Sequence, residues 1–459
     1  MPKQPYLTAP LKSDRMPPGI PYIVGNEAAE RFNFYGMRAI LVVYMTKFLV
    51  DRSGAVAPMS ENDANAAYHW FLSANYFFPM LGAIVSDAFW GKYRTILWIS
   101  LVYCLGSVVL ALDHTRLGLT LGLTLIAIGS GGIKPCVSSH VGDQFGSDNQ
   151  HLLSRAFGWF YFSVNFGSFF SILLIPKLLT WYGPLPAFGL PAVLMLLATY
   201  IFWSGRYKFA HIPPGGRVFL GQTFNREGLS ALGRLAVLFI FVAIFWSLWD
   251  QSGGEWVLQA EKMDLHFLGM NWEASQIQAV NAIMVLAFIP LFQYLIYPAI
   301  SRVFPLTPLR KIGLGLIAAG LSFLVSAWIE NQLAAGLKPN IAWQMPAYAL
   351  LTAGEIMVSI TGLEFAYTQS PRHMKAMVQA LYLLSISAGN AFTALVHWFI
   401  ENPDGSLKLH GASYYHFFAA LSIGCVAIYI FVARAYKERS YLQGEEPAAD
   451  PLTDAPQGT

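Results

Sequence analysis

The segment NEAAERFNFYGMR, residues 26–38, places two carboxylates and two guanidinium groups inside an apolar stretch. Glu27, Glu30, Arg31 and Arg38 recur at three- and four-residue spacing, so on a helix they form one stripe. A charge in hydrocarbon costs at least about 2.5 kcal/mol, so such a stripe is either paired or functional. Two carboxylates near an arginine can exchange partners when a proton arrives, which indicates a proton switch. The alternative is a static network of ion pairs that docks helices.

Two further titratable residues of the first half lie in apolar segments. Lys134 stands in IAIGSGGIKPCVS, whose glycines allow another helix to approach closely, and we predict Glu27 or Glu30 as its partner. His69 lies near the outer end of the second apolar segment. A lone histidine is often a satisfied helix residue, yet beside buried acids it can accept a proton near neutral pH. Both interpretations of His69 stay open.

The second half of the chain contributes buried acids instead. Asp250 follows two tryptophans in FWSLWDQSGGEW and precedes two glycines, a pattern typical of a flexible helix tip at a gate. Glu355 lies deeper in its apolar segment than Glu364, so we predict Glu355 as a ligand-facing carboxylate and Glu364 as a gate or capping residue. Cations in one half that face acids in the other half suit a short zwitterion.

Polar and aromatic residues complete the predicted cavity. Asn165 and Asn281, in otherwise apolar segments, are predicted to hydrogen-bond backbone-like groups of a ligand; the alternative is an interhelical hydrogen bond. Aromatic side chains with polar ends can accept varied ligand side chains. The predicted aromatic set is Tyr35, Tyr44, Tyr68, Tyr161, Trp246 and Tyr382.

The elements that must position these residues are membrane-spanning helices. Hydrophobic residues make up 55 % of the 459 residues and charged residues only 12 %, which excludes an ordinary soluble protein. Apolar windows predict twelve helices, and the long polar connector divides them into six and six. The predicted units are a cytoplasmic tail over 1–19, a bundle over 20–204, a cytoplasmic linker over 205–231, a bundle over 232–437 and a disordered tail over 438–459.

The positive charges give the orientation of the chain. Most of the 29 lysines and arginines fall in connections on one side, so both termini are predicted to be cytoplasmic. Two six-helix halves around a midplane site are the layout of the major facilitator fold. The segment GAIVSDAFWGKYRTI, residues 82–96, resembles the G-x-x-x-D-x-x-G-[RK] loop of that superfamily. There Asp87 would cap and tether a neighbouring helix end; the alternative is a generic polar loop.

Several segments together resemble the proton-dependent oligopeptide transporter family. Residues 27–35 are similar to its E-x-x-E-R-F-x-Y-Y motif, with Phe34 in place of the first tyrosine. Further matches are GSGGIKPCVS with GDQF, FYFSVNFGS, FWSLWDQSGGEW and GEIMVSITGLEFAYTQSP. Tyr382 departs from the family pattern, because many members carry tryptophan there. His69 matches a histidine that animal members use in proton handling.

The resemblance implies inward symport of di- and tripeptides with protons by alternating access. It places Glu27, Glu30, Arg31 and Lys134 in proton handling, with Asp250 at an outer gate. It places Arg38 and Lys134 near the peptide carboxylate, and Glu355, Asn165 and Asn281 near the peptide amino group.

The implied setting is a bacterial inner membrane. The 331–343 loop is too short for the large outer domain of animal members, and the connector too short for two extra helices. We expect a monomer in the lipid bilayer, with no cofactor, metal or nucleic-acid partner, driven by the proton gradient. Peptide-like drugs are further expected substrates.

Three other classes of function agree less well with the sequence. A related transporter of nitrate, an amino acid or a drug is opposed by the intact Glu27, Glu30, Arg31 and Glu355 set. A receptor on a transporter scaffold usually carries a long signalling tail, and an enzyme should show a metal cluster, nucleophile elbow or phosphate loop. None of these features is apparent in the sequence, so we expect no enzyme.

Overall fold

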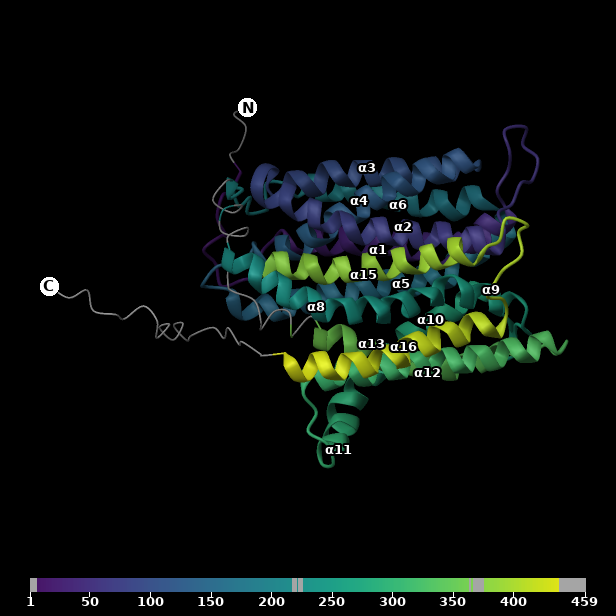
Figure 1. Ribbon diagram of the computed structural model, residues 1–459. Coiled ribbons are helices and arrows are strands. Elements are labelled where there is room, and N and C mark those ends of the chain that lie inside the picture. The colour runs from purple at the N-terminus through teal and green to yellow at the C-terminus, as the bar shows by residue number, and fades with distance from the viewer. Residues whose placement is uncertain (1–5, 217–220, 222–225, 363–364, 366–374, 437–459) are drawn as a thin grey trace.

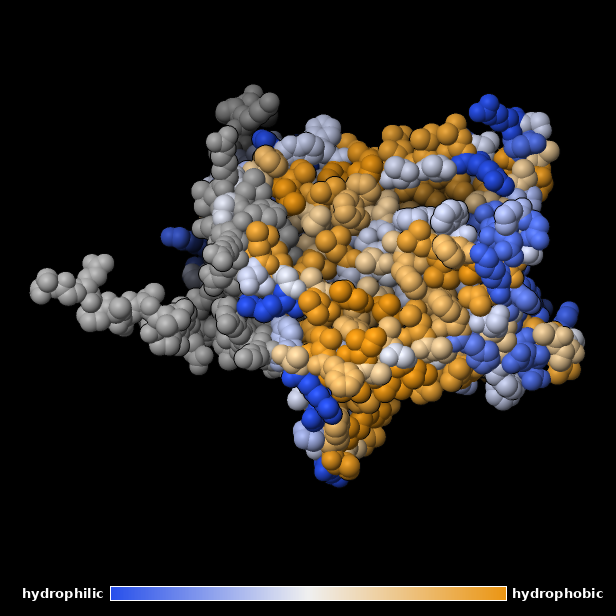
Figure 2. All heavy atoms as spheres, viewed as in Figure 1, coloured by the Kyte–Doolittle hydropathy of each residue, from blue (hydrophilic) through white to orange (hydrophobic). Residues whose placement is uncertain are grey.

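The computed structural model describes residues 6–216, 221, 226–362, 365 and 375–436. Long helices run side by side along one axis. The beginning of α1 and the end of α16 lie at the same end of the molecule (Figure 1). Figure 2 shows hydrophobic residues over the middle of the bundle and hydrophilic residues gathered at the end opposite the chain termini. This distribution suits a membrane-spanning protein, and the shared position of the two helix ends agrees with an even number of spans.

The first six spans follow one another through short connections. Ser60 and Thr115 cap α2 and α4, since each side chain accepts a hydrogen bond from the backbone N–H three residues on. The helices are α1 (Ile20–Lys47), α2 (Glu61–Ile84, continued by the π-helix η1, Val85–Trp90), α3 (Lys92–Leu112), α4 (Arg116–Gly142), α5 (Leu153–Tyr182) and α6 (Pro184–Ser204).

The second six spans contain more breaks. A 3-10 turn, η3 (Asp250–Gly253), separates α8 (Arg226–Trp249) from α9 (Glu255–Glu261) at the predicted flexible tip. Span eight joins η4 (Ala274–Gln278), α10 (Ala279–Leu291), the π-helix η5 (Phe292–Ile296) and α11 (Tyr297–Ser301). The others are α12 (Pro308–Ala334), α13 (Gln344–Glu355) with the π-helix η7 (Ile356–Ile360), α15 (Lys375–Ile400) and α16 (Ala412–Ala435).

Twelve helical spans in two bundles agree with the predicted fold class. Within the described residues, nine helices are long and apolar enough to cross a membrane by themselves; α1, α2 and α13 complete the set. The N-terminal core lies almost entirely within residues 20–209 and the C-terminal core within residues 235–429. A two-stranded hairpin, β1 (His266–Phe267) with β2 (Met270–Asn271), lies in the outer loop after α9.

The domain boundaries expected from the sequence stay a prediction, and two segments do not follow them. The helix α8 begins at Arg226, within the stretch expected as linker. Leu7, from the expected tail, pairs with Ala210 of the linker, and Tyr6 stacks on His211 at 4.3 Å between ring centroids. Tyr6 and Leu7 are therefore packed against the linker segment that follows the N-terminal bundle.

The glycines of α4 allow the close helix contacts expected of them. A Cβ atom on Gly129 would lie 2.5 Å from the Tyr103 side chain of α3, and one on Gly131 2.6 Å from the Asn75 carbonyl of α2. Any larger side chain would push these helices apart. The close packing holds Lys134, one turn further on, against α1 and α2.

Candidate functional site

The charged stripe of α1 is buried and pairs mainly with itself. Arg31 Nε lies 2.7 Å from Glu27 Oε1 and 3.1 Å from Glu30 Oε2. The other oxygen of Glu30 accepts a hydrogen bond of 2.8 Å from Ser130 of α4. One guanidinium therefore faces two carboxylates, which is the arrangement that the sequence predicted for a proton-controlled exchange of partners.

Lys134 is not paired as the sequence predicted. Its Nζ atom lies over the ring of Phe34 at 4.1 Å and over the ring of Tyr76 at 4.6 Å. Among the described residues it has no hydrogen-bond partner, and neither Glu27 nor Glu30 lies within ion-pair distance. The reason is that Arg31 already occupies both carboxylates. Phe34, which replaces the tyrosine of the family motif, supplies an aromatic face that attracts the ammonium.

Arg38 and Asp250 join the two bundles. Arg38 Nη2 lies 2.6 Å from Asp250 Oδ1, and Arg38 Nε donates a hydrogen bond of 2.8 Å to the Tyr68 hydroxyl. Asp250 accepts a second bond of 2.6 Å from Asn390 of α15. All four residues are buried, so this is a desolvated ion pair between α1 and η3. The peptide-carboxylate role of Arg38 stays a prediction, because here Asp250 occupies its guanidinium.

His69 belongs to the same network through Asn390. The Asn390 amide nitrogen donates to Asp250 and to the Ile386 carbonyl, so its oxygen must be the acceptor for His69 Nδ1 at 2.7 Å. His69 Nδ1 therefore carries a proton, and no described group bonds its Nε2. Sequence reasoning missed Asn390, although it recurs at helical spacing with Ser387 and His397 on one face of α15.

Glu355 and Asn281 lie together, as the resemblance to the family implied. Glu355 Oε2 accepts hydrogen bonds of 2.8 Å from Asn281 Nδ2 and 3.0 Å from Trp249 Nε1. The Trp249 ring also lies 5.1 Å from the Arg38 guanidinium. Asn165 is not part of this group, since the described bond of its amide, 2.8 Å long, goes to the Tyr161 carbonyl of its own helix.

Four of the predicted aromatic residues belong to the bundle cores, Tyr44 and Tyr68 to the N-terminal core and Trp246 and Tyr382 to the C-terminal core. Tyr44 is fully buried and packs edge-on against Phe188 of α6 at 4.9 Å between ring centroids. Tyr382 is buried against Phe239 of α8 at 5.6 Å. Neither is among the residues that line the inner cavity. Hydropathy does not distinguish a tyrosine that packs in a core from one that faces a ligand.

Tyr68 and Trp246 also contact the charged residues or their partners. Tyr68 accepts a hydrogen bond from Arg38, and Trp246 packs edge-on against Trp249 at 5.3 Å between ring centroids. Tyr35 packs edge-on against Phe34 at 5.4 Å. Tyr161 is half exposed on α5.

A cavity of about 600 Å³ opens toward the cytoplasmic side. Arg31, Tyr76 and Lys134 line its deeper part, Asp87 and Lys92 its cytoplasmic part, and Leu383 of α15 the facing wall. Thus the cations of the N-terminal bundle face the cavity, while the Arg38–Asp250 pair closes the opposite side.

The helix-end tether that was predicted for Asp87 is made by a neighbouring residue. Lys92 Nζ lies 2.8 Å from Asp143, the residue that ends α4, whereas the Asp87 carboxylate accepts only a long bond of 3.4 Å from Ser86 among the described residues. The backbone carbonyl of Asp87 accepts a bond from Gly215 of the linker. Glu364 lies outside the described residues.

Comparison with known proteins gives the family. The chain matches the POT family model over residues 93–226 and 221–414. It is 37 % identical to peptide transporter family 1 of Drosophila melanogaster and 35 % identical to solute carrier family 15 member 2 of Mus musculus. These matches cover 69 % and 77 % of this chain but 48 % and 55 % of those proteins, so the chain spans about half the length of these relatives.

Solved structures agree over nearly the whole chain. The POT family transporter PepTSo has a TM-score of 0.83 and 36 % identity, with 92 % of this chain and 99 % of that chain covered. An auto-inhibited POT family peptide transporter has a TM-score of 0.83 and 34 % identity, with 94 % and 99 % covered. This chain is therefore a multi-pass membrane protein that belongs to the POT family, the proton-dependent oligopeptide transporters.

Proposed function

We propose that this protein imports di- and tripeptides together with protons by alternating access. The observation that carries the proposal is the cavity between the bundles, which is open toward the cytoplasm and lined by Arg31 and Lys134. On the other bundle, Glu355 is held by Asn281 and Trp249. Cationic groups suit a peptide carboxylate and Glu355 suits its ammonium group. Glu355 is not among the residues that line the cavity, so the proposal requires the peptide to reach beyond the cavity wall to this carboxylate.

Two groups of carboxylates would couple transport to protons: Glu27 with Glu30 on α1, and Asp250 at the outer gate. Protonation of Glu27 or Glu30 would release Arg31 from one of its two ion pairs. Lys134 could then lose or gain a counter-ion without a change in its own position. At the outer side, Asp250 would have to release Arg38 before the bundles separate. We place the protein in a bacterial inner membrane, as a monomer that also accepts peptide-like drugs.

Uptake into liposomes tests the proposal. Purified protein in liposomes with an inward proton gradient should concentrate labelled dialanine, and a protonophore should abolish the concentration. Uptake that is absent or insensitive to the gradient would contradict the proposed function.

Competition by modified dipeptides tests the two walls. N-acetyl-dialanine lacks the ammonium group and dialanine amide lacks the carboxylate, so each should compete more weakly than dialanine. Glu355→Gln should reduce the preference for dialanine over the acetylated peptide, because it removes the partner of the ammonium group. Equal competition by all three peptides would contradict the recognition of the two peptide ends.

A further inference from the structure

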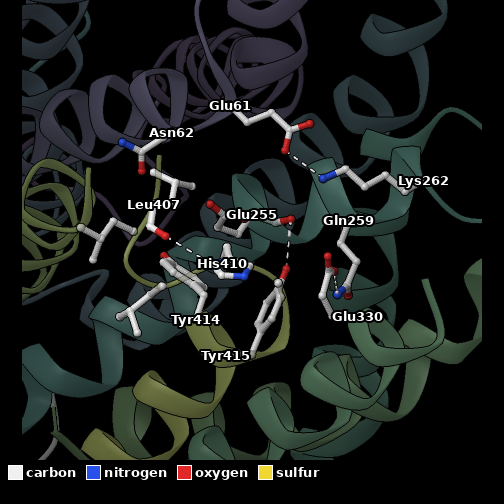
Figure 3. Close-up of a pocket in the computed structure, with 13 residues that line it drawn as sticks. Glu61, Asn62, Glu255, Gln259, Lys262, Glu330, Leu407, His410, Tyr414 and Tyr415 are labelled. Atoms are coloured by element: carbon white, nitrogen blue, oxygen red, sulfur yellow. Dashed lines mark hydrogen bonds and ion pairs between the residues drawn. The ribbon is translucent and has the colours of Figure 1, made fainter. Parts of the chain in front are cut away.

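A second cavity lies at the outer end of the molecule, between the two bundles. It has a volume of about 220 Å³ and is lined by carboxylates from three helices, Glu61 of α2, Glu255 of α9 and Glu330 of α12 (Figure 3). Lys262 forms an ion pair of 2.9 Å with Glu61 across its rim. Because both bundles contribute to its wall, the cavity must change when the outer gate opens.

A buried histidine lies next to this cavity. His397 of α15 has its Nδ1 atom 2.8 Å from the oxygen of Asn62. The Asn62 nitrogen donates to the His397 carbonyl and to Glu401, so the Asn62 oxygen must accept and His397 Nδ1 must carry a proton. When the ring is neutral, the remaining ring nitrogen, Nε2, therefore accepts a hydrogen bond of 3.0 Å from the Tyr414 hydroxyl group.

Glu255 is the carboxylate that faces the same ring nitrogen. Its Oε1 atom lies 3.9 Å from His397 Nε2, a distance at which an ion pair exists only if the imidazole is charged. The same oxygen accepts a hydrogen bond of 2.8 Å from Asn65. Two residues of the C-terminal bundle thus each hold an asparagine of α2, and these asparagines are about one helical turn apart.

We propose that His397 and Glu255 form a proton-sensitive latch of the outer gate, in which His397 is a positioning residue for transport. The inference rests on the proposed peptide symport and adds a regulatory group to it. A proton from external water binds His397 Nε2, and the Tyr414 hydroxyl turns to become an acceptor. The resulting imidazolium pairs with the Glu255 carboxylate. The bond from His397 Nδ1 to the Asn62 oxygen then has a charged donor, which strengthens it, and the new ion pair with Glu255 adds to it, so that the closed outer gate is favoured.

Burial of the His397 ring disfavours its charged form, and the charged and titratable neighbours decide how much of this cost is offset. Carboxylates of the cavity and of the following loop favour the imidazolium, whereas the His69 ring, stacked 6.1 Å away, disfavours a second positive charge beside it. The groups near His397 on the surrounding elements are Glu61, His69, Asp250, Glu255, Lys262, Glu330, Glu401, His410, Tyr414 and Tyr415. Protonation of His69 and of His397 is therefore expected to be mutually exclusive.

Distance measurements between the bundles test the latch. Spin labels at Val56→Cys and Lys338→Cys, on exposed outer loops of opposite bundles, report the outer gate in a background with Cys104, Cys136 and Cys425 replaced by alanine. The full-length protein in nanodiscs is compared at about pH 5.5 and about pH 7.5, one unit on either side of the ordinary histidine pKa. The closed population should rise at least about threefold in acid.

The variants separate the latch from other titrating groups. His397→Gln keeps a donor for Asn62, and Glu255→Gln keeps an acceptor for Asn65, but each removes the charge, so both should abolish most of the acid-induced closure. His416→Gln, on the exposed face of α16, should keep it.

Acid-induced closure that persists in both latch variants would overturn the inference. If His397→Gln fails to fold, Glu255→Gln decides the question alone. Gradient-driven dialanine uptake is measured with the same protein preparations reconstituted in liposomes. A wild type without such uptake would contradict the proposed symport, whereas the distance data would still stand.

Discussion

At the outer end of the molecule charged side chains join the two bundles, whereas at the inner end the described ion pairs lie within the N-terminal bundle. The outer pairs connect α1 or α2 with the segment that contains η3 and α9. They are Arg38 with Asp250, Lys47 with Glu261 and Lys262 with Glu61. The inner pairs are Arg31 with Glu27 and Glu30, and Lys92 with Asp143.

Within the part of the chain that the structure describes, this difference agrees with a large cavity that opens toward the cytoplasmic side. The N-terminal and C-terminal bundles are held together at their outer ends, and between their inner ends lies a space of about 600 Å³. The contacts between α2 and α15 include several polar ones, such as Ser73 with Ser387 at 3.2 Å and His69 with Asn390 at 2.7 Å. Polar contacts can be exchanged for water when the bundles separate, so the outer end can open without exposing a large apolar surface. The structure is therefore an inward-facing state.

The largest expected effect comes from breaking the buried outer pair. Asp250→Asn leaves the Arg38 guanidinium buried without a counter-ion, which costs about 3–5 kcal/mol. We expect a strong fall in thermal stability in detergent and a loss of dialanine uptake. The double variant Arg38→Gln with Asp250→Asn should be more stable than either single variant, because no lone charge remains. Additive losses of stability would contradict the pairing.

For Lys134, at the inner end, we expect a loss of uptake without a loss of stability. Lys134→Met removes a buried ammonium that no described acid pairs with, so the melting temperature should stay equal or rise. Gradient-driven uptake should fall at least about tenfold, equivalent to about 1.4 kcal/mol in the rate-limiting barrier. Lys177→Met, next to Trp181 on α5, removes the same charge elsewhere and should preserve uptake. A marked loss of stability in Lys134→Met would indicate a structural ion pair instead.

Glu355 and Asn165 were grouped by sequence and are separated by the structure. Glu355→Gln should weaken binding of dialanine about tenfold, since the ammonium group loses its carboxylate partner. Asn165→Ala removes an amide that bonds its own helix, so the affinity should change by less than about threefold. Isothermal titration calorimetry in detergent measures both. Equal losses would show that Asn165 also contacts the peptide.

The smallest effects are expected from the exposed outer pairs. Lys47 is about half exposed, and Lys262 and Glu61 are similarly accessible. Such pairs contribute at most about 1 kcal/mol, and salt screens them. Lys47→Gln and Lys262→Gln should therefore shift the outer-gate population only slightly, and about 1 M NaCl should remove the difference from wild type. A shift as large as that of Asp250→Asn would mean that these pairs are not screened.

The sequence by itself determined the number and order of the spans, their orientation and the charged stripe of α1. These features are local, because a helix repeats every 3.6 residues and a membrane requires about 20 apolar residues per span. The same periodicity places Glu27, Glu30 and Arg31 on one face wherever the helix packs. The grouping of Glu355 with Asn281 came from resemblance to the family.

Only the tertiary structure decided which partner each buried charge meets. Lys134 lies over Phe34 and Tyr76 because Arg31 already holds both glutamates. Tyr44 packs in a core, and His397 meets Asn62 across more than 300 residues of chain. Contacts of this kind depend on how helices far apart in the sequence pack together. A local pattern of residues carries no information about that packing. The buried charges were therefore predictable as a set, but their pairing was decided by packing.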